Sequence, residues 1–235
     1  DLSARYPGFQ TLNYATYVRA ADLPAFEARE RADAMLADAG IEFTVRVKNA
    51  GAEHEILTFV GPLQANRDVL GADLEAKSGR GDALQRMRDS GTSLSSGRRI
   101  FAERGADQVG LAMRLPVYRR GMPAATVAER RLAYLGSVGA GIRINGMMAG
   151  LVSSQTLRLL HFRIYDAGSL HERELAPSAA TLLYDSALGP SLAVSHGPRA
   201  DTAVPEAHKG ALVRDAYGEF AGRRWRIVFA ADVPV

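Results

Sequence analysis

The chain has 235 residues, enough for one large domain or two small ones with a hydrophobic core. Its formal net charge is +3, and the basic residues lie in short scattered clusters such as Arg98-Arg99 and Arg223-Arg224. Nucleic-acid binding needs a continuous basic stripe with aromatic residues interleaved, so this class of function is excluded. Cysteine is absent, which excludes disulfides, thiol catalysis and cysteine-based zinc sites.

The residue pattern in chain order predicts an α+β fold. Asp22 as N-cap, Pro24 in the first turn and Gly40 at the end predict a helix within the first 40 residues. Alternation and turn residues predict strands over 43–47, 56–60, 92–96, 109–118, 132–138, 157–165 and 181–184, and a closing hairpin of 212–220 with 224–230. Helical spacing predicts helices over 82–89, ended by Gly91, and over 145–155.

A loop around Gly121 and Pro123 suggests a subdomain boundary. We therefore expect three parts: an N-terminal helical segment (1–40), a first sheet-containing subdomain (41–125) and a second one (126–235). The second half repeats the order of elements of the first, without any repeat at the level of sequence.

The strand over 109–118 carries the strongest indication of a binding site. Its odd-numbered face is apolar at Leu111, Met113, Leu115 and Val117, which predicts a core face. The opposite face carries Gly110, Ala112, Arg114 and Pro116. Small residues on a strand face allow a ligand or another backbone to come close, so we expect a pocket there.

No motif for catalysis or for a cofactor is present. The five histidines are dispersed without metal-ligand spacing, and neither a nucleophile motif nor a phosphate loop occurs. Gly139-Ala140-Gly141 follows a predicted strand, but Ile144 stands where a dinucleotide fingerprint needs its third glycine, so we expect a turn. The sequence predicts a protein that is not an enzyme and has no cofactor and no metal site.

Several short motifs occur together in an order and at a spacing that resemble the CHASE domain, the extracytoplasmic sensor of plant cytokinin receptors and of many bacterial membrane receptors. The resemblance covers most of the chain and is closest between Leu57 and Gly136. The residues that carry it are Phe59-Val60-Gly61-Pro62, Asn66, Gly71-Ala72-Asp73-Leu74, Ser90-Gly91, Leu115-Pro116-Val117-Tyr118 and Thr126 to Arg131 before Leu135-Gly136.

This resemblance implies a long N-terminal helix followed by two PAS-like subdomains, the first membrane-distal and ligand-binding. It also implies that Asp73 matches the aspartate that binds the adenine ring of the hormone in plant receptors, and that Ser95 matches a position with a backbone contact to the ligand. The residues alone favour Asp73 as an N-cap of a following helix, and with the resemblance the two interpretations have equal weight and do not exclude each other. Arg114 departs from the family, and is expected either to contact an anionic ligand, to reach solvent or to pair with Asp73.

We expect Asp73, Ser95, Gly110, Ala112 and Arg114 to line one cavity, with Phe59 as a further wall. The resemblance implies a periplasmic small-molecule sensor domain of an inner-membrane receptor that acts as a homodimer. Its ligand would be adenine-like or carboxylate-bearing, and its flanking transmembrane helices and its output domain, a histidine kinase or diguanylate cyclase, would lie outside this chain. The alternatives are a dimerisation module without a ligand and a small periplasmic hydrolase, which the missing nucleophile motif disfavours.

Overall fold

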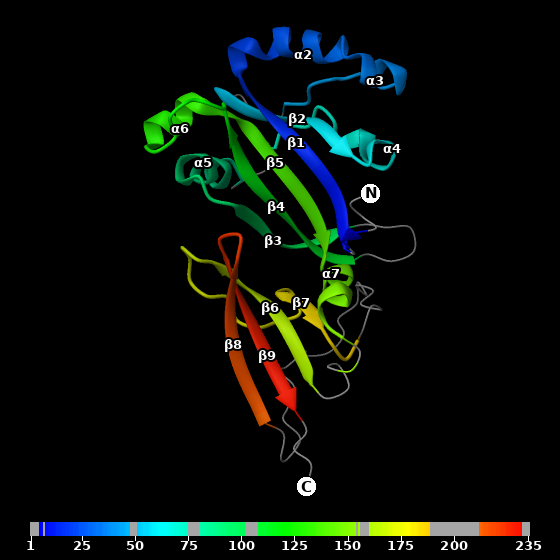
Figure 1. The fold of residues 1–235 in the computed structure, drawn as a ribbon, viewed down its shortest axis with the longest axis vertical. Helices are drawn as coiled ribbons and strands as arrows, with labels where there is room; N and C mark the ends of the chain where they lie inside the picture. Colours follow the sequence, from blue (N-terminus) through cyan, green and yellow to red (C-terminus); the bar gives the residue numbers. More distant parts are fainter. Residues whose placement is uncertain are drawn as a thin grey trace. The chain divides into compact units, whose positions relative to one another are not determined.

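The structure is a computed structural model that describes residues 5–6, 8–47, 51–74, 80–101, 108–153, 155, 160–188 and 212–231. It is an α+β fold with two antiparallel sheets (Figure 1). The strands are β1 (Phe9–Arg19), β2 (Glu53–Gly61), β3 (Leu94–Phe101), β4 (Gln108–Tyr118), β5 (Tyr134–Arg143), β6 (His161–Ser169), β7 (Leu182–Asp185), β8 (Leu212–Phe220) and β9 (Arg223–Ala231). The α-helices are α2 (Leu23–Arg31), α3 (Ala34–Asp38), α4 (Leu63–Asn66), α5 (Arg80–Ser90), α6 (Val127–Ala133) and α7 (Ile144–Leu151).

The first sheet has the strand order β2-β1-β5-β4-β3, so its middle strands come from distant parts of the chain. The expectation that the N-terminal 40 residues are a helical segment is wrong for β1. This strand is rich in Tyr, Thr and Val, which favour extended structure, and it is hydrogen-bonded between β2 and β5. Helix formation is confined to α2 and α3, and Asp33 rather than Asp22 provides a side-chain cap.

Strand β5 completes this first sheet, although its position in the sequence predicted that it would belong to the second subdomain. It lies between β1 and β4, as Figure 1 shows. The segment Gly139-Ala140-Gly141 is part of β5 and not a turn before a helix, so that expectation is wrong. Glycine is required at 139 because the Arg114 side chain occupies the space that a Cβ atom would need.

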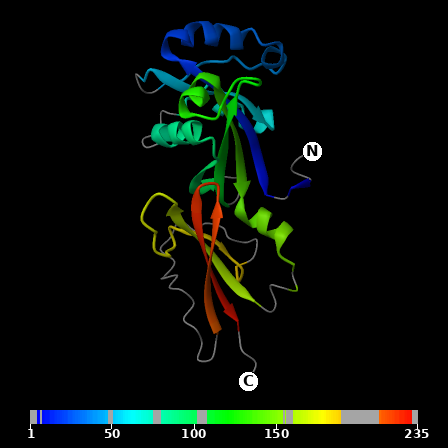
Figure 2. The same ribbon diagram turned by 60° about the vertical axis from the view of Figure 1, so that its left-hand side comes forward.

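The second sheet has the order β7-β6-β9-β8, and β8 with β9 forms the predicted closing hairpin. Its turn is at Ala221 and Gly222, which both have positive φ values of 46° and 76°. Figures 1 and 2 show β9 of this hairpin beside β6, in agreement with the pairing of Ile164 with Ile227. The strand predicted over 181–184 is confirmed as β7.

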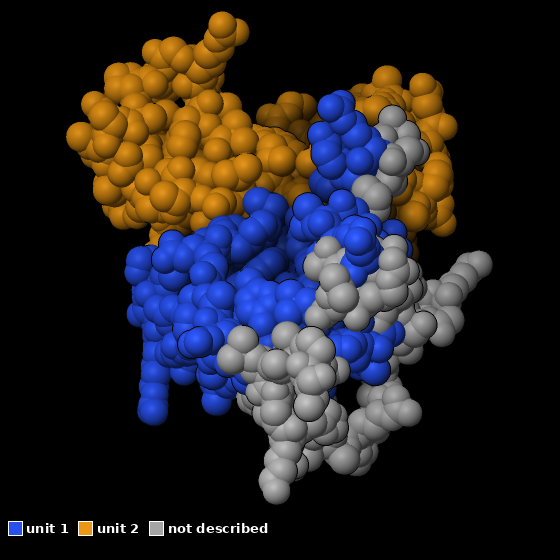
Figure 3. Space-filling view, turned by 60° about the horizontal axis from the view of Figure 1, so that its bottom comes forward, with its two compact units in different colours: residues 1–10, 95–113, 141–235 blue, residues 11–94, 114–140 orange. Residues whose placement is uncertain are grey.

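The chain packs as two compact units, coloured separately in Figure 3. Unit 1 comprises residues 1–10, 95–113 and 141–235, and unit 2 comprises residues 11–94 and 114–140. Strands β1, β3, β4 and β5 contribute residues to both units. The boundaries expected at 40/41 and 125/126 both lie inside unit 2, because strands distant in sequence pack together there.

Unit 2 has two apolar clusters. In the first, Phe26 of α2 and Leu36 of α3 pack with Val18 and Ile56 from the sheet. Phe43 is buried in this cluster, but the strand predicted over 43–47 is reduced to a single bridge between Arg46 and Ala72.

The second cluster joins α5 to the sheet, with Leu84 and Met87 against Tyr134. The prediction of this helix is confirmed, and Gly91 follows it with a φ of 74° that suits a glycine C′ residue.

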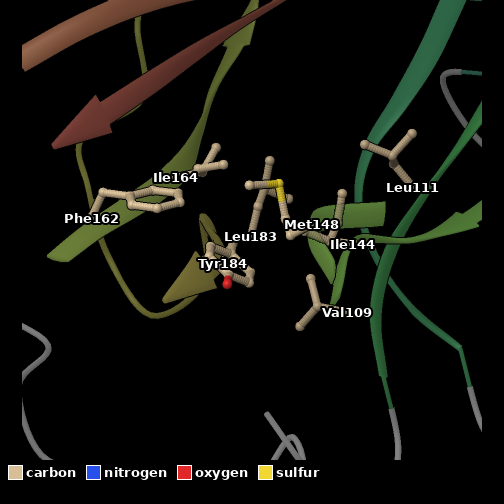
Figure 4. Packing of buried hydrophobic residues seen from close by; sticks show 8 residues of the cluster. All are labelled: Val109, Leu111, Ile144, Met148, Phe162, Ile164, Leu183 and Tyr184. Carbon is tan, nitrogen blue, oxygen red and sulfur yellow. The ribbon is translucent and has the colours of Figure 1, made fainter. Parts of the chain in front are cut away.

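The core of unit 1 forms between α7 and the sheets. Figure 4 shows Ile144 and Met148 of α7 close to Leu183 of β7 and Leu111 of β4. The predicted core face of β4 is therefore confirmed at Leu111. The prediction of a core face is wrong at Leu115, whose side chain is 48% exposed. Near this end of β4, Tyr118 and not Leu115 packs against the apolar cluster that contains Leu84 and Met87 of α5.

Candidate functional site

Arg114 is the central residue of a polar cluster inside unit 2. Its side chain extends from β4 across β5 to β1. The guanidinium Nε donates to Ser137 Oγ and Nη2 donates to the Ser137 carbonyl oxygen, both at 2.8 Å, while Nη1 donates to Asn13 Oδ1 at 2.7 Å. This path runs directly over Gly139, where a Cβ atom would lie 2.9 Å from Arg114 Cζ and closer still to Nη1. Glycine at 139 is therefore what gives the guanidinium its place against the sheet.

Glu55 of β2 is the acid of the same cluster and is only 2% exposed. Its carboxylate accepts hydrogen bonds from Ser137 Oγ at 2.6 Å and from the Tyr134 hydroxyl. Burial raises the pKa of the Glu55 carboxyl, and the two hydrogen bonds and the charges of Arg114 and Arg88 oppose this shift only in part. Burial also lowers the pKa of Arg114, while burial and the nearby Glu55 charge raise the pKa of Tyr134.

A second layer of charges connects this cluster to α5. Glu53 accepts from the Tyr17 hydroxyl at 2.6 Å and from Arg88 Nη1 at 2.9 Å. Arg88 Nε in turn donates to Asp89 at 3.0 Å, and Asp89 also pairs with Arg131 of α6. These hydrogen bonds lower the pKa of Asp89, that of Arg131 contributing most. The ends of α5 and α6 are thus tied to the strand that carries Glu55.

Asp73 is buried, and its Oδ2 lies 2.9 Å from Nδ1 of the buried His54. The segment around Asp73 is held along the edge of β2, since Leu74 N–H donates to the Glu55 carbonyl at 2.8 Å and Asp73 forms a bridge with Ile56. The backbone at Asp73 is therefore part of a β-bridge to β2. Residues 75–79, where the helix of the N-cap interpretation would continue, lie outside the described residues. Adjacent residues of β2 thus hold Asp73 through His54 and the Arg114 cluster through Glu55.

The other residues expected to line the cavity have the following places. Ser95 is buried and its N–H donates to the Ala221 carbonyl at 2.8 Å. Gly110 is buried in β4, and the N–H of Ala112 donates to Ser96 Oγ at 3.1 Å.

Phe59 is 44% exposed in β2. Asp73, Phe59 and Arg114 belong to unit 2, whereas Ser95, Gly110 and Ala112 belong to unit 1. That all six line one cavity stays a prediction.

Arg114 is half-buried, and among the described residues its hydrogen-bond partners are Ser137 and Asn13 and not Asp73, so the pairing with Asp73 that the sequence suggested as an alternative is wrong. Sequence reasoning missed Glu55, Ser137, Asn13, Tyr134 and Gly139. No local signal existed for Glu55, because a glutamate at the start of a strand is usually exposed and its partners lie far away in the sequence. No local signal connects β1, β2 and β5 to Arg114.

An open surface hollow of about 500 Å³ is lined by Glu174, Tyr217, Gly218, Glu219 and Arg224 of unit 1, none of which the sequence predicted as a site residue. Within the described ranges, no group of three or more His, Asp or Glu side chains could hold a metal ion. Among those same residues, no helix is both long and apolar enough to cross a membrane.

The chain is thus an α+β domain with two antiparallel sheets and a charged, hydrogen-bonded cluster buried in one unit. It belongs to the CHASE domain family, whose model matches residues 1–184. The resemblance predicted from the sequence is confirmed, and the chain is an extracytoplasmic sensor domain. None of the curated proteins matches the sequence.

Solved structures are similar to this chain at low identity. The ligand-binding domain of the Pseudomonas aeruginosa PAO1 amino acid chemoreceptor PctC, solved in complex with GABA, is 16% identical; the match covers 98% of this chain and 76% of that one, with a TM-score of 0.43. The periplasmic sensory domain of the Campylobacter jejuni chemoreceptor Tlp1 is 10% identical over 96% of this chain and 72% of that one, with a TM-score of 0.42. An extracellular ligand-binding receptor from Desulfohalobium retbaense DSM5692 is 12% identical over 75% of this chain and 28% of that one, at 0.41. These TM-scores are too low to show a common fold.

Proposed function

We propose that this chain is the small-molecule sensor of a bacterial transmembrane receptor, with its binding site on the first sheet. Asp73 and Arg114 are its polar anchors, and Ser95, Gly110, Ala112 and Phe59 complete the lining. The ligand is adenine-like or carboxylate-bearing. The sensor lies in the periplasm, its sheet-containing parts are the PAS-like subdomains of the family, and a histidine kinase or diguanylate cyclase is the output.

The buried cluster of Arg114, Glu55 and Ser137 is the single observation that supports this site best. Placing a guanidinium and a carboxylate inside a fold costs stability that apolar packing does not, so such clusters concentrate at functional sites. The family membership supplies the sensory role, and the cluster supplies polar groups of the kind that fix a small ligand.

Signalling follows from differential binding to two conformations of a homodimeric receptor. A ligand that binds one arrangement of the sensor more tightly shifts the population toward it. The charges that tie β2 to α5 and α6 give the cluster a physical connection to those helices. The competing interpretation, a dimerisation module without a ligand, predicts no binding at all.

A thermal-shift screen of the 235-residue chain against adenine derivatives and small carboxylates tests the proposal, because a ligand that binds only the folded state raises the melting temperature. Titration calorimetry then compares Gly110→Leu, which should abolish binding by filling the cavity, with Asp73→Asn, which should weaken it. Gly218→Leu is the matched control, since a Cβ at 218 meets nothing within 4 Å. Unchanged affinity in the Gly110 and Asp73 variants would rule out this binding site and would favour the interpretation as a dimerisation module without a ligand.

A further inference from the structure

The Arg114 side chain is half-buried, and within the described part of the chain its guanidinium has no carboxylate in contact. Arginine has five N–H donors, and three of those in Arg114 donate to Ser137 Oγ, the Ser137 carbonyl and Asn13 Oδ1, all of them uncharged acceptors. Among the residues that the structure describes, no carboxylate lies within ion-pair distance of it. Two N–H groups, one on each terminal nitrogen, therefore have no partner within the described part of the chain, and a guanidinium prefers to fill such positions with a planar anion.

Glu55 balances this charge indirectly. Ser137 Oγ stands between the two groups, accepting from Arg114 Nε at 2.8 Å and donating to Glu55 Oε2 at 2.6 Å. An ionised Glu55 lowers the electrostatic attraction of Arg114 for any other anion, whereas a protonated Glu55 leaves a net positive cluster. Because Glu55 is buried and Arg114 is half-buried, their charges interact more strongly than they would in water.

We propose, resting on the proposed function, that this sensor binds the carboxylate group of its ligand at Arg114 and that protonation of Glu55 permits this binding. The affinity for carboxylates then rises as the pH falls. An adenine-like ligand, which brings no negative charge to Arg114, would show no such dependence.

The groups around Glu55 make it the acid that changes charge within this cluster. Facing it are Tyr134 from β5, Arg114 from β4, Tyr14 from β1 and Arg88 from α5. Burial is the largest cause in raising the pKa values of Tyr14 and Tyr134, so both stay neutral, and both arginines stay charged. Burial raises the pKa of Glu55, whereas at the neighbouring Glu53 the hydrogen bonds from Tyr17 and Arg88 outweigh burial and lower the pKa.

The test compares carboxylates with the amides in which each carboxylate is replaced by a neutral carboxamide, using acetate with acetamide, succinate with succinamide and 4-aminobutyrate with 4-aminobutyramide. Calorimetric titration of the 235-residue chain is run from mildly acidic to mildly basic pH. Carboxylates should bind and amides should not. Above the pKa of Glu55 the carboxylate affinity should fall by up to about tenfold for each pH unit, because each binding event then takes up one proton.

Two variants locate the effect. Glu55→Gln should bind carboxylates at the acidic wild-type level at every pH, and Arg114→Gln should lose carboxylate binding. Since removing Arg114 alone leaves Glu55 buried and unbalanced, the double variant Arg114→Gln/Glu55→Gln repeats the second test in a neutral cluster. His54→Gln is the control for the neighbouring titratable residue, and it should keep the pH dependence.

Equal binding of acids and amides would overturn the inference, as would a pH dependence that survives in Glu55→Gln or disappears in His54→Gln. If adenine derivatives bind and no carboxylate does, the sensor function stands and this inference fails. If no compound of either class binds, the proposed function itself fails.

Discussion

Gly139 has no side chain at the point where Arg114 crosses β5, and its role depends on that absence. A Cβ at this position would lie 2.9 Å from Arg114 Cζ, a separation that real side chains do not tolerate without movement. The guanidinium is held on both sides by Ser137 and Asn13, so it has no free direction in which to move. A methyl group here acts directly on the cluster.

Gly139→Ala should therefore destabilise the fold by about 1–3 kcal/mol, the usual cost of overpacking a closely packed interior. It should also weaken carboxylate binding at Arg114. Urea unfolding measures the first effect and calorimetric titration the second. Gly218→Ala, in β8 with nothing within 4 Å of the new methyl group, should change the unfolding free energy by less than about 0.5 kcal/mol. Equal effects of the two variants would show that Arg114 does not occupy this place.

At the scale of elements, α6 begins with a complete capping box. Thr126 Oγ1 accepts from Glu129 N–H at 3.2 Å, and Glu129 Oε2 accepts from Thr126 N–H at 2.8 Å. Arg130 then joins this helix to α5 by donating to the Asp89 carbonyl at 2.6 Å. The capping box thus fixes the start of α6, and with it the position of Arg130, which is the partner of the C-terminal end of α5.

Thr126→Ala should cost about 1 kcal/mol of stability because one orphan helical N–H loses its acceptor. Thermal unfolding measures the loss, and Thr126→Ser, which keeps the hydroxyl, is the matched control. The backbone N–H of Thr126, first among several causes, lowers the pKa of Glu129. The contribution of Glu129 is therefore present above the ordinary glutamate pKa and is lost as the pH falls through the lowered one. A Thr126→Ala variant as stable as the Ser variant would contradict the cap.

At the scale of the whole molecule, the two compact units are interleaved in sequence. The chain passes between them at residues 10/11, 94/95, 113/114 and 140/141. The large apolar side chains that remain exposed among the described residues are spread over several elements, such as Met35 of α3, Leu132 of α6 and Leu151 of α7. Single exposed apolar residues of this kind are ordinary for a protein surface and do not by themselves form an interface.

We expect this 235-residue chain to be a monomer or a weak dimer in solution. Sedimentation velocity over a range of protein concentrations checks this expectation. A tight dimer at low micromolar concentration would contradict it and would place the pairing surface on this chain. A further run with saturating ligand shows whether binding changes the association, as a dimeric receptor requires.

The sequence by itself determined the elements whose signals are local. The alternation in β8 and β9 with Gly222 between them predicted the hairpin, and helical spacing before Gly91 predicted α5. It also determined the CHASE family, from short motifs in a fixed order. Each of these depends on residues close to one another in the chain.

Only the tertiary structure decided which strands are neighbours and which groups meet. Periodicity shows the face on which a residue lies, but not the sheet to which its strand belongs. For this reason β5 was expected in the second subdomain, whereas it lies between β1 and β4 in the first sheet. Arg114 bonds to Asn13, 101 positions away, and Ser137 bonds to Glu55, 82 positions away. The physical reason is that a buried charge takes its partner from whichever strand the sheet places beside it, and strand order is a property of the whole fold.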